Sequence, residues 1–148
     1  MHESLTIALI QARETTMSFF RPILKSYNLT EQQWRIIRVL ASSRSIDFHD
    51  LANLTCILRP SLTGILTRME RDGLIFRLKP MSDQRKLYVS LTPAGQELYE
   101  QAKEEVIEGY KAIEAAFSSE KLVQLLKLLD ELIAIGSYSQ NDTDENEE

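Results

Sequence analysis

A short predicted helix that starts at Pro60 carries side chains suited to hydrogen bonding with nucleic-acid bases. Its apolar residues are spaced as one helical stripe, and the opposite side carries Ser61, Thr63, Gly64, Thr67, Arg68 and Arg71. Small residues let a helix backbone approach a groove floor, hydroxyls contact base edges, and Arg can donate two hydrogen bonds to guanine. The pattern favours a helix that enters the DNA major groove. The alternative is an ordinary solvated helix face.

The segment after this helix predicts a hairpin with a charged tip. Residues 74–79 and 86–91 read as strands, with Leu74, Phe76 and Leu78 alternating along the first strand. The turn between them contains Asp83, Arg85 and Lys86. Asp83 can hold Arg85 extended, and an extended Arg can enter a narrow, strongly negative minor groove. A plain surface turn with an incidental ion pair is the alternative.

The positive charge of the chain is concentrated in these two elements. The 148 residues have a net charge of -5, but residues 59–86 hold seven basic and three acidic side chains, a net charge of +4. The last dozen residues hold five acids and no base. Local charge decides contact with DNA more than the total does. The predicted DNA-binding set therefore also includes Arg59, Pro60, Arg77 and Lys79.

The remaining elements are predicted to be helices that hold this surface in place. Residues 4–27 form a helix kinked near residues 18–20 because of Pro22. A Thr30–Gln33 capping box opens the next helix, a short strand follows at Ile46, and Asp47 caps a third helix. Long helices follow over residues 93–117 and from a cap at Ser118 to Ile135, with Gly136 closing the last one. The expected fold is mostly α with a small β-hairpin wing.

Two lobes are expected from this order of elements. A winged helix-turn-helix DNA-binding domain spans residues 30–92, residues 1–29 and 93–136 form a helical dimerisation region, and residues 137–148 form an acidic, disordered tail. The last helix has more apolar residues than one small lobe can cover, and the first helix is similarly apolar. A homodimer would cover these apolar residues, and it would place its two DNA-binding helices, one from each copy, about one DNA turn apart.

Composition argues against other classes of protein. The sequence has no paired-carboxylate site, no nucleophile triad and no phosphate loop, and two histidines with one cysteine cannot build a common zinc site. We therefore expect no enzyme activity and no cofactor. No signal peptide and no membrane-spanning run is evident, so a cytoplasmic protein without membrane contact is expected. Cys56 is expected to be a small buried residue and not a redox switch.

The chain resembles the MarR family of winged helix-turn-helix regulators. The resemblance lies in residues 47–52, 61–63, 68–70 and 73–74, in Asp83-x-Arg85 and in Leu91-Thr92-x-x-Gly95. Residues 12–14, 30–40 and 56–70 resemble its homoprotocatechuate- and hydroxyphenylacetate-responsive branch. That resemblance implies a homodimeric repressor of an aromatic-acid degradation operon, released from double-stranded operator DNA by a small phenolic carboxylic acid such as 4-hydroxyphenylacetate or 3,4-dihydroxyphenylacetate. The alternatives are a regulator of a surface-protein gene and a regulator with no small ligand.

The resemblance also implies a ligand site centred on three residues spaced along one helix face. Trp34 would cover the ring, Arg38 would pair with the carboxylate, and Glu31 would accept a hydrogen bond from the phenol. Trp34 as core and Arg38 as an ion-pair partner of the dimer lobe are the alternatives. Arg13 is either a second carboxylate partner or a buried ion pair with the helix over 93–117. The resemblance adds Ser4 of the partner chain, Phe20, Leu24, Val106 and Tyr110. His49 is expected to be a surface or hinge residue, and contact with the phenol is the alternative.

Overall fold

The computed structural model describes residues 4–144, and the side chains of residues 4–136. The chain divides into two compact units, one ending at Gly109 and one beginning at Tyr110, and the boundary falls within helix α6 (Pro93–Phe117). Each unit is described by itself below. This division by compactness does not test the predicted DNA-binding and dimerisation regions, which stay predictions.

The N-terminal part forms two helices instead of one kinked helix. Helix α1 spans Leu5–Ser18 and α2 spans Arg21–Ser26, with the break at the two residues between them. Pro22 lies in the first turn of α2 and has no backbone N–H, so it cannot continue the hydrogen bonding of α1. The predicted position of the irregularity is confirmed, and its extent is larger than a kink.

Three further helices form the core of the first unit. Helix α3 (Glu31–Ala41) opens with the predicted capping box, and Asp47 caps α4 (Phe48–Thr55) through the backbone N–H groups of its first turn. Helix α5 spans Arg59–Arg71, and the chain leaves it through Gly73 at a φ of 76°, a value that favours glycine. The side chains that meet between these helices are fully buried, among them Ile36, Ile37, Leu40, Leu51, Leu62, Leu66 and Met69.

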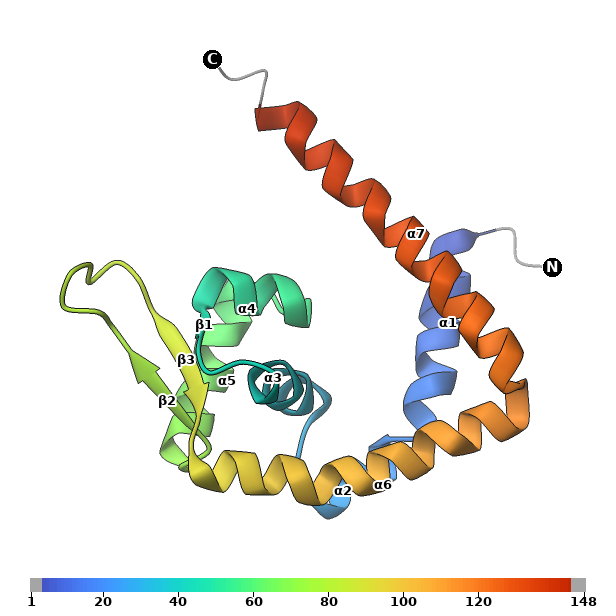
Figure 1. The fold of residues 1–148 in the computed structure, drawn as a ribbon, viewed down its shortest axis with the longest axis horizontal. Coiled ribbons are helices and arrows are strands. Elements are labelled where there is room, and N and C mark those ends of the chain that lie inside the picture. The colour runs from blue at the N-terminus through green and yellow to red at the C-terminus, as the bar shows by residue number, and fades with distance from the viewer. Residues whose placement is uncertain (1–3, 145–148) are drawn as a thin grey trace. The chain divides into compact units, whose positions relative to one another are not determined.

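A three-stranded antiparallel sheet completes this unit, with strand order β1-β3-β2. Its strands are β1 (Ile46–Asp47), β2 (Ile75–Leu78) and β3 (Tyr88–Leu91), and Figure 1 shows the β2–β3 loop projecting beyond α4 and α5. Leu74, Phe76 and Leu78 do not form the buried face of β2, since Phe76 is 55% exposed and Leu78 is 67% exposed. Ile75 takes the inward position, and alternate residues of a strand face opposite sides, so Phe76 and Leu78 face solvent while Leu74 is half-buried.

The end of the sheet is tied to the start of α6. The Thr92 hydroxyl donates to the Gly73 carbonyl at 2.6 Å, and the Gly95 backbone N–H donates to the Thr92 oxygen at 3.0 Å. A Cβ at Gly95 would overlap the Leu74 carbonyl oxygen, so this close approach requires glycine. The Leu91-Thr92-x-x-Gly95 motif therefore fixes the base of the hairpin to α6.

The second unit contains the end of α6 and helix α7 (Ser119–Asp144). The prediction that the last helix ends at Gly136 is wrong, because the helix continues to Asp144 and Gly136 does not adopt a positive φ. The predicted disorder of the acidic tail falls, for residues 145–148, outside the described residues. Ile113 and Leu122 of this unit are buried, whereas eight other large apolar side chains are between 38% and 69% exposed: Phe117, Val123, Leu125, Leu126, Leu128, Leu132, Ile133 and Ile135.

Cys56 corrects a further prediction. It is exposed and not buried, because it ends α4 in a left-handed conformation with a φ of 55° and the next residue, Ile57, takes the inward position. Separately, no helix in the described part of the chain is both long enough and apolar enough to cross a bilayer.

Candidate nucleic-acid interface and ligand site

The outer face of α5 is polar and open to solvent. Its predicted DNA-binding residues are all exposed: Arg59, Pro60, Ser61, Thr63, Gly64, Thr67, Arg68 and Arg71. The Thr63 hydroxyl donates to the Arg59 carbonyl at 3.2 Å, and the Thr67 hydroxyl donates to the Thr63 carbonyl at 2.9 Å. With their protons used in the helix, these hydroxyls offer lone pairs and methyl groups to a base edge.

At the wing tip, Asp83 holds Arg85 in the way that the sequence predicts. The Asp83 carboxylate accepts the Arg85 backbone N–H at 3.1 Å and its Nε at 3.0 Å. The pKa of Asp83 is lowered, first by the side-chain hydrogen bond from Arg85 and then by the backbone one. The Arg85 side chain remains 91% exposed, so the guanidinium is oriented but is still available to a partner.

Arg77 makes more contacts within the protein than Arg85 does, and it is less exposed. Its Nε and backbone N each donate to Glu70 Oε2 at 3.2 Å, and its Nη2 donates to Oε1 at 3.1 Å. Its Nη1 donates to the Thr67 hydroxyl oxygen at 3.1 Å. The Arg77 side chain is only 25% exposed. The pKa of Glu70 is lowered, chiefly by the side-chain hydrogen bond from Arg77.

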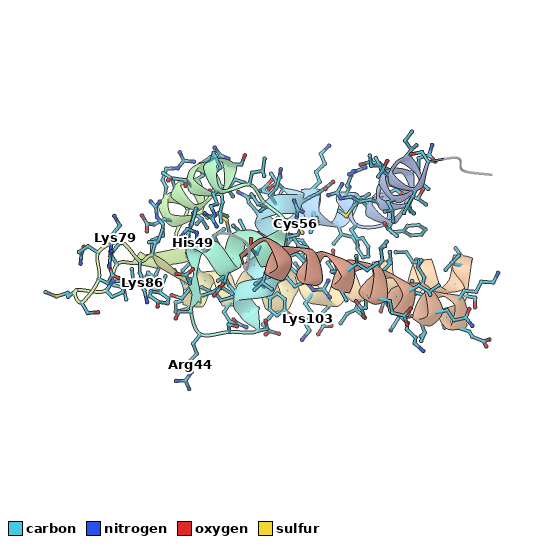
Figure 2. All side chains as sticks on the ribbon, turned by 90° about the horizontal axis from the view of Figure 1, so that it is seen from above. Arg44, His49, Cys56, Lys79, Lys86 and Lys103 are labelled. Carbon is cyan, nitrogen blue, oxygen red and sulfur yellow. The ribbon has the colours of Figure 1, made fainter. Side chains whose placement is uncertain are left out.

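An open cleft of about 620 Å³ lies between the wing, the start of α4 and α5. Thr63 lines it from α5, and His49 lines it from α4. Figure 2 shows Lys79 and Lys86 on the wing, both of which also line the cleft. Neither lysine forms an ion pair within the described part of the chain. The cleft is therefore bordered by cations that can meet phosphate oxygens. His49 is exposed, as predicted.

The ligand residues predicted on α3 are in three different environments. Glu31 accepts hydrogen bonds from two arginines: its Oε2 accepts from Arg13 Nη2 at 2.6 Å, and its Oε1 accepts from Arg21 Nε at 2.7 Å. Arg21 also pairs with Glu14 at 2.8 Å. The pKa of Glu31 is lowered, mainly by the hydrogen bond from Arg21. Arg13 thus pairs with α3 instead of α6, and its side chain is 47% exposed, so the buried pair considered for it does not form.

Trp34 and Arg38 differ in burial. Trp34 is 8% exposed and stacks on Tyr99, with 5.7 Å between ring centroids and 23° between ring planes, so Tyr99 covers one indole face. Arg38 is exposed, and its side chain makes no hydrogen bond or ion pair with any described residue. On the same helix, Arg35 has a buried Nε that lacks a hydrogen-bond partner among the described residues.

The other predicted ligand residues are distributed over both units. In the first unit, Leu24 is buried, Val106 packs against the core, Phe20 is half-buried, and the Ser4 hydroxyl caps α1 at the Ile7 N–H. Tyr110 belongs to the second unit and is 39% exposed.

Comparison with known proteins relates this chain to regulators of transcription. Residues 29–87 match the MarR family model. The homoprotocatechuate degradative operon repressor of Escherichia coli is 66% identical over 142 residues, which cover 96% of each chain. The chain belongs to the MarR family. The HTH-type transcriptional regulator FarR of Neisseria gonorrhoeae is 58% identical over 134 residues, covering 90% of this chain and 92% of FarR.

A solved structure agrees with this membership. The crystal structure of NadR in complex with 4-hydroxyphenylacetate has a TM-score of 0.77 and 58% identity, covering 88% of this chain and 93% of that one. The predicted fold class, a mostly helical winged helix-turn-helix protein, is confirmed. The protein is a transcriptional regulator and not an enzyme, as the sequence predicts.

In this MarR-family regulator, sequence reasoning missed residues that act through contacts between elements. Glu70 and Arg77 are separated by the turn at Gly73, and Arg21 reaches Glu31 across the end of α2. Tyr99 meets Trp34 from α6. Helical periodicity cannot reveal such pairs because their partners lie on different elements. A weak signal was present in the paired opposite charges of Glu70 and Arg77 on either side of a predicted turn.

Proposed function

We propose that this protein is a homodimeric repressor that binds a pseudo-palindromic operator and is released by a small phenolic acid of the 4-hydroxyphenylacetate or 3,4-dihydroxyphenylacetate type. It acts in the cytoplasm and controls an operon for degradation of an aromatic acid. The observation that carries the proposal is the open polar face of α5 beside an exposed, oriented Arg85 on the same unit. Such a helix and arm can serve the major and the adjacent minor groove.

The identity of the operon is supported by the relatives. The Escherichia coli protein that is 66% identical is named for the homoprotocatechuate degradative operon, and the match covers almost the whole of both chains. In addition, the cations on the α5 face and the wing offset the acidic total charge at the surface where DNA would lie.

The effector class is supported by the residues of α3 and by NadR, which was solved with 4-hydroxyphenylacetate. A carboxylate needs a cation, and Arg38 is exposed and unpaired in the described part of the chain. The unpartnered Nε of Arg35 is a second donor on the same helix. Tyr99 covers one face of the Trp34 indole, so we expect the ring of the effector to contact the indole at its edge or on its opposite face.

Release would follow from a change in the spacing of two reading helices. A ligand at the base of the DNA-binding lobe stabilises whichever dimer geometry it binds more tightly. If that geometry separates the two α5 helices by a distance that does not match successive major grooves, affinity for the operator falls.

A mobility-shift titration tests the proposal. The purified protein is titrated onto the promoter region of an aromatic-degradation operon, with and without 4-hydroxyphenylacetate, and benzoate serves as a control acid. We expect selective binding that 4-hydroxyphenylacetate weakens and a melting temperature that the same acid raises by mass action. Selective binding without any response to phenolic acids would support the alternative of a regulator with no small ligand. Binding only at the promoter of a surface-protein gene would support that gene as the target in place of the proposed operon.

A further inference from the structure

We propose that Arg77 is a positioning residue that holds α5 against the wing through Glu70 and Thr67, and that it is not a DNA contact. The inference rests on the proposed operator binding and corrects the role that its charge suggests. It explains how two elements that must meet adjacent grooves keep one relative orientation.

Three of the five N–H groups of the Arg77 guanidinium donate within the protein, and the side chain is largely covered. Nε, Nη1 and Nη2 each already donate to an acceptor within the protein, at 3.1 to 3.2 Å. Arg85 shows the contrast, because its side chain is 91% exposed whereas that of Arg77 is 25% exposed. A planar guanidinium that holds a carboxylate through two nitrogens has a fixed orientation, so it also fixes the elements that carry the pair.

The partners of Arg77 lie on the recognition helix. Glu70 is in the last turn of α5, and its two oxygens accept three hydrogen bonds from Arg77 of β2. Thr67 is one turn earlier and lies on the exposed face predicted to meet DNA. Arg77 therefore orients the Thr67 hydroxyl directly, and through Glu70 it fixes the angle of α5 relative to the wing.

The charge of Glu70 makes the proposal testable by the sign of an effect. A carboxylate on a DNA-facing surface repels phosphates, so its removal raises affinity if its only influence is electrostatic. If Glu70 positions α5, its removal lowers affinity for the operator although a negative charge has been lost. These two expectations have opposite directions.

The experiment measures binding by fluorescence anisotropy to the operator and to an unrelated duplex at several salt concentrations. We expect Glu70→Gln and Arg77→Lys each to weaken operator binding about tenfold, with little change on the unrelated duplex and no change in salt slope, since no phosphate contact is lost. The swap Glu70→Arg with Arg77→Glu should recover most of the lost affinity. Asp72→Asn is the matched control, because Asp72 is an exposed acid just after α5 and its loss should leave affinity equal or higher.

Several outcomes overturn the inference. An unchanged or raised operator affinity in Glu70→Gln would overturn it. So would the signature of a phosphate contact, in which Arg77→Met reduces the salt slope by about 1 and Arg77→Lys binds the operator with full affinity. Circular dichroism melts verify that each variant is folded. If Arg77→Met does not fold, Arg77→Lys provides the test of Arg77. A wild-type protein that prefers no duplex overturns the proposed function itself, whereas selective wild-type binding with unaffected variants overturns only the role of Arg77.

Discussion

Arg13 of α1 and Glu31 of α3 are joined by a hydrogen-bonded ion pair of 2.6 Å. The second oxygen of Glu31 accepts from Arg21 of α2 at 2.7 Å, so one carboxylate connects the N-terminal helices to α3, the first helix of the predicted DNA-binding domain. A phenol that hydrogen-bonds to Glu31 would have to share this carboxylate with two arginines. Binding at this position would therefore be coupled to the contact between α1 and α3.

This network predicts a dependence of stability on pH. The pKa of Glu31 lies below its ordinary value of 4.5 in the folded protein, mainly because Arg21 donates to it. A lowered folded-state pKa stabilises the protein above the unfolded pKa, and that contribution is lost as pH falls through the folded value. Glu31→Gln should therefore melt lower than the wild type at pH 7, by roughly 2–4 °C for about 1 kcal/mol, and the difference should shrink below pH of about 4.5.

Scanning calorimetry at pH 7, 5, 4 and 3 checks this expectation. Glu104→Gln is the control, because Glu104 is an exposed glutamate of α6 without an ion pair in the described part of the chain. A difference between Glu31→Gln and the wild type that is the same at every pH would show that the ion pair contributes nothing through its charge.

Arg85→Ala should weaken operator binding about tenfold or more while the dimer remains intact, because the exposed guanidinium held by Asp83 would be lost from the minor groove. A mobility-shift titration measures the affinity, and light scattering measures the oligomeric state. Arg44→Ala is the matched control: Figure 2 shows Arg44 pointing outward, away from Lys79 and Lys86. Near-normal binding by Arg85→Ala would contradict the role of the wing tip.

Arg38→Ala should bind the operator normally but respond about tenfold or more weakly to 4-hydroxyphenylacetate. The substitution removes the guanidinium that would hydrogen-bond to the carboxylate of the effector. Arg38→Lys should recover part of the response because it keeps the charge without the planar fork. The measurement is the ligand concentration that releases half of the bound operator. If Arg38→Ala is released at the wild-type concentration, the carboxylate lies elsewhere. Arg35, whose buried Nε has no hydrogen-bond partner among the described residues, then becomes the next residue to change.

Ile133→Arg should shift the protein from dimer to monomer, because the 69% exposed Ile133 belongs to the apolar surface of α7 that a second copy would cover. We expect the dimer dissociation constant to rise about 30-fold or more, as for a buried interface residue. Light scattering over a dilution series measures it. Gln124→Arg adds the same charge at an exposed polar position of α7 and should leave the dimer unchanged. A dimer that is equally stable in both variants would move the interface away from this face.

Much of the local structure follows from short-range rules that the sequence displays. The Thr30–Gln33 capping box and the Asp47 cap involve neighbouring residues, so they could be predicted and are confirmed. The contact between Asp83 and Arg85 is also local, two residues apart, and it is present. The predicted helix end at Gly136 failed because glycine permits a helix end but does not force one.

The sequence by itself determined the family, the surface that carries positive charge and, apart from the separation of α1 and α2, the order of helices and strands. Each of these depends on residue type and spacing along the chain. Tertiary structure decided which of those charges are free. Arg77 and Arg85 are both basic wing residues, yet Arg77 is bound by Glu70 across the Gly73 turn and Arg85 extends into solvent. Glu31 likewise acquired two arginines from α1 and α2. Such pairings depend on the packing of separate elements, so spacing along one helix does not reveal them.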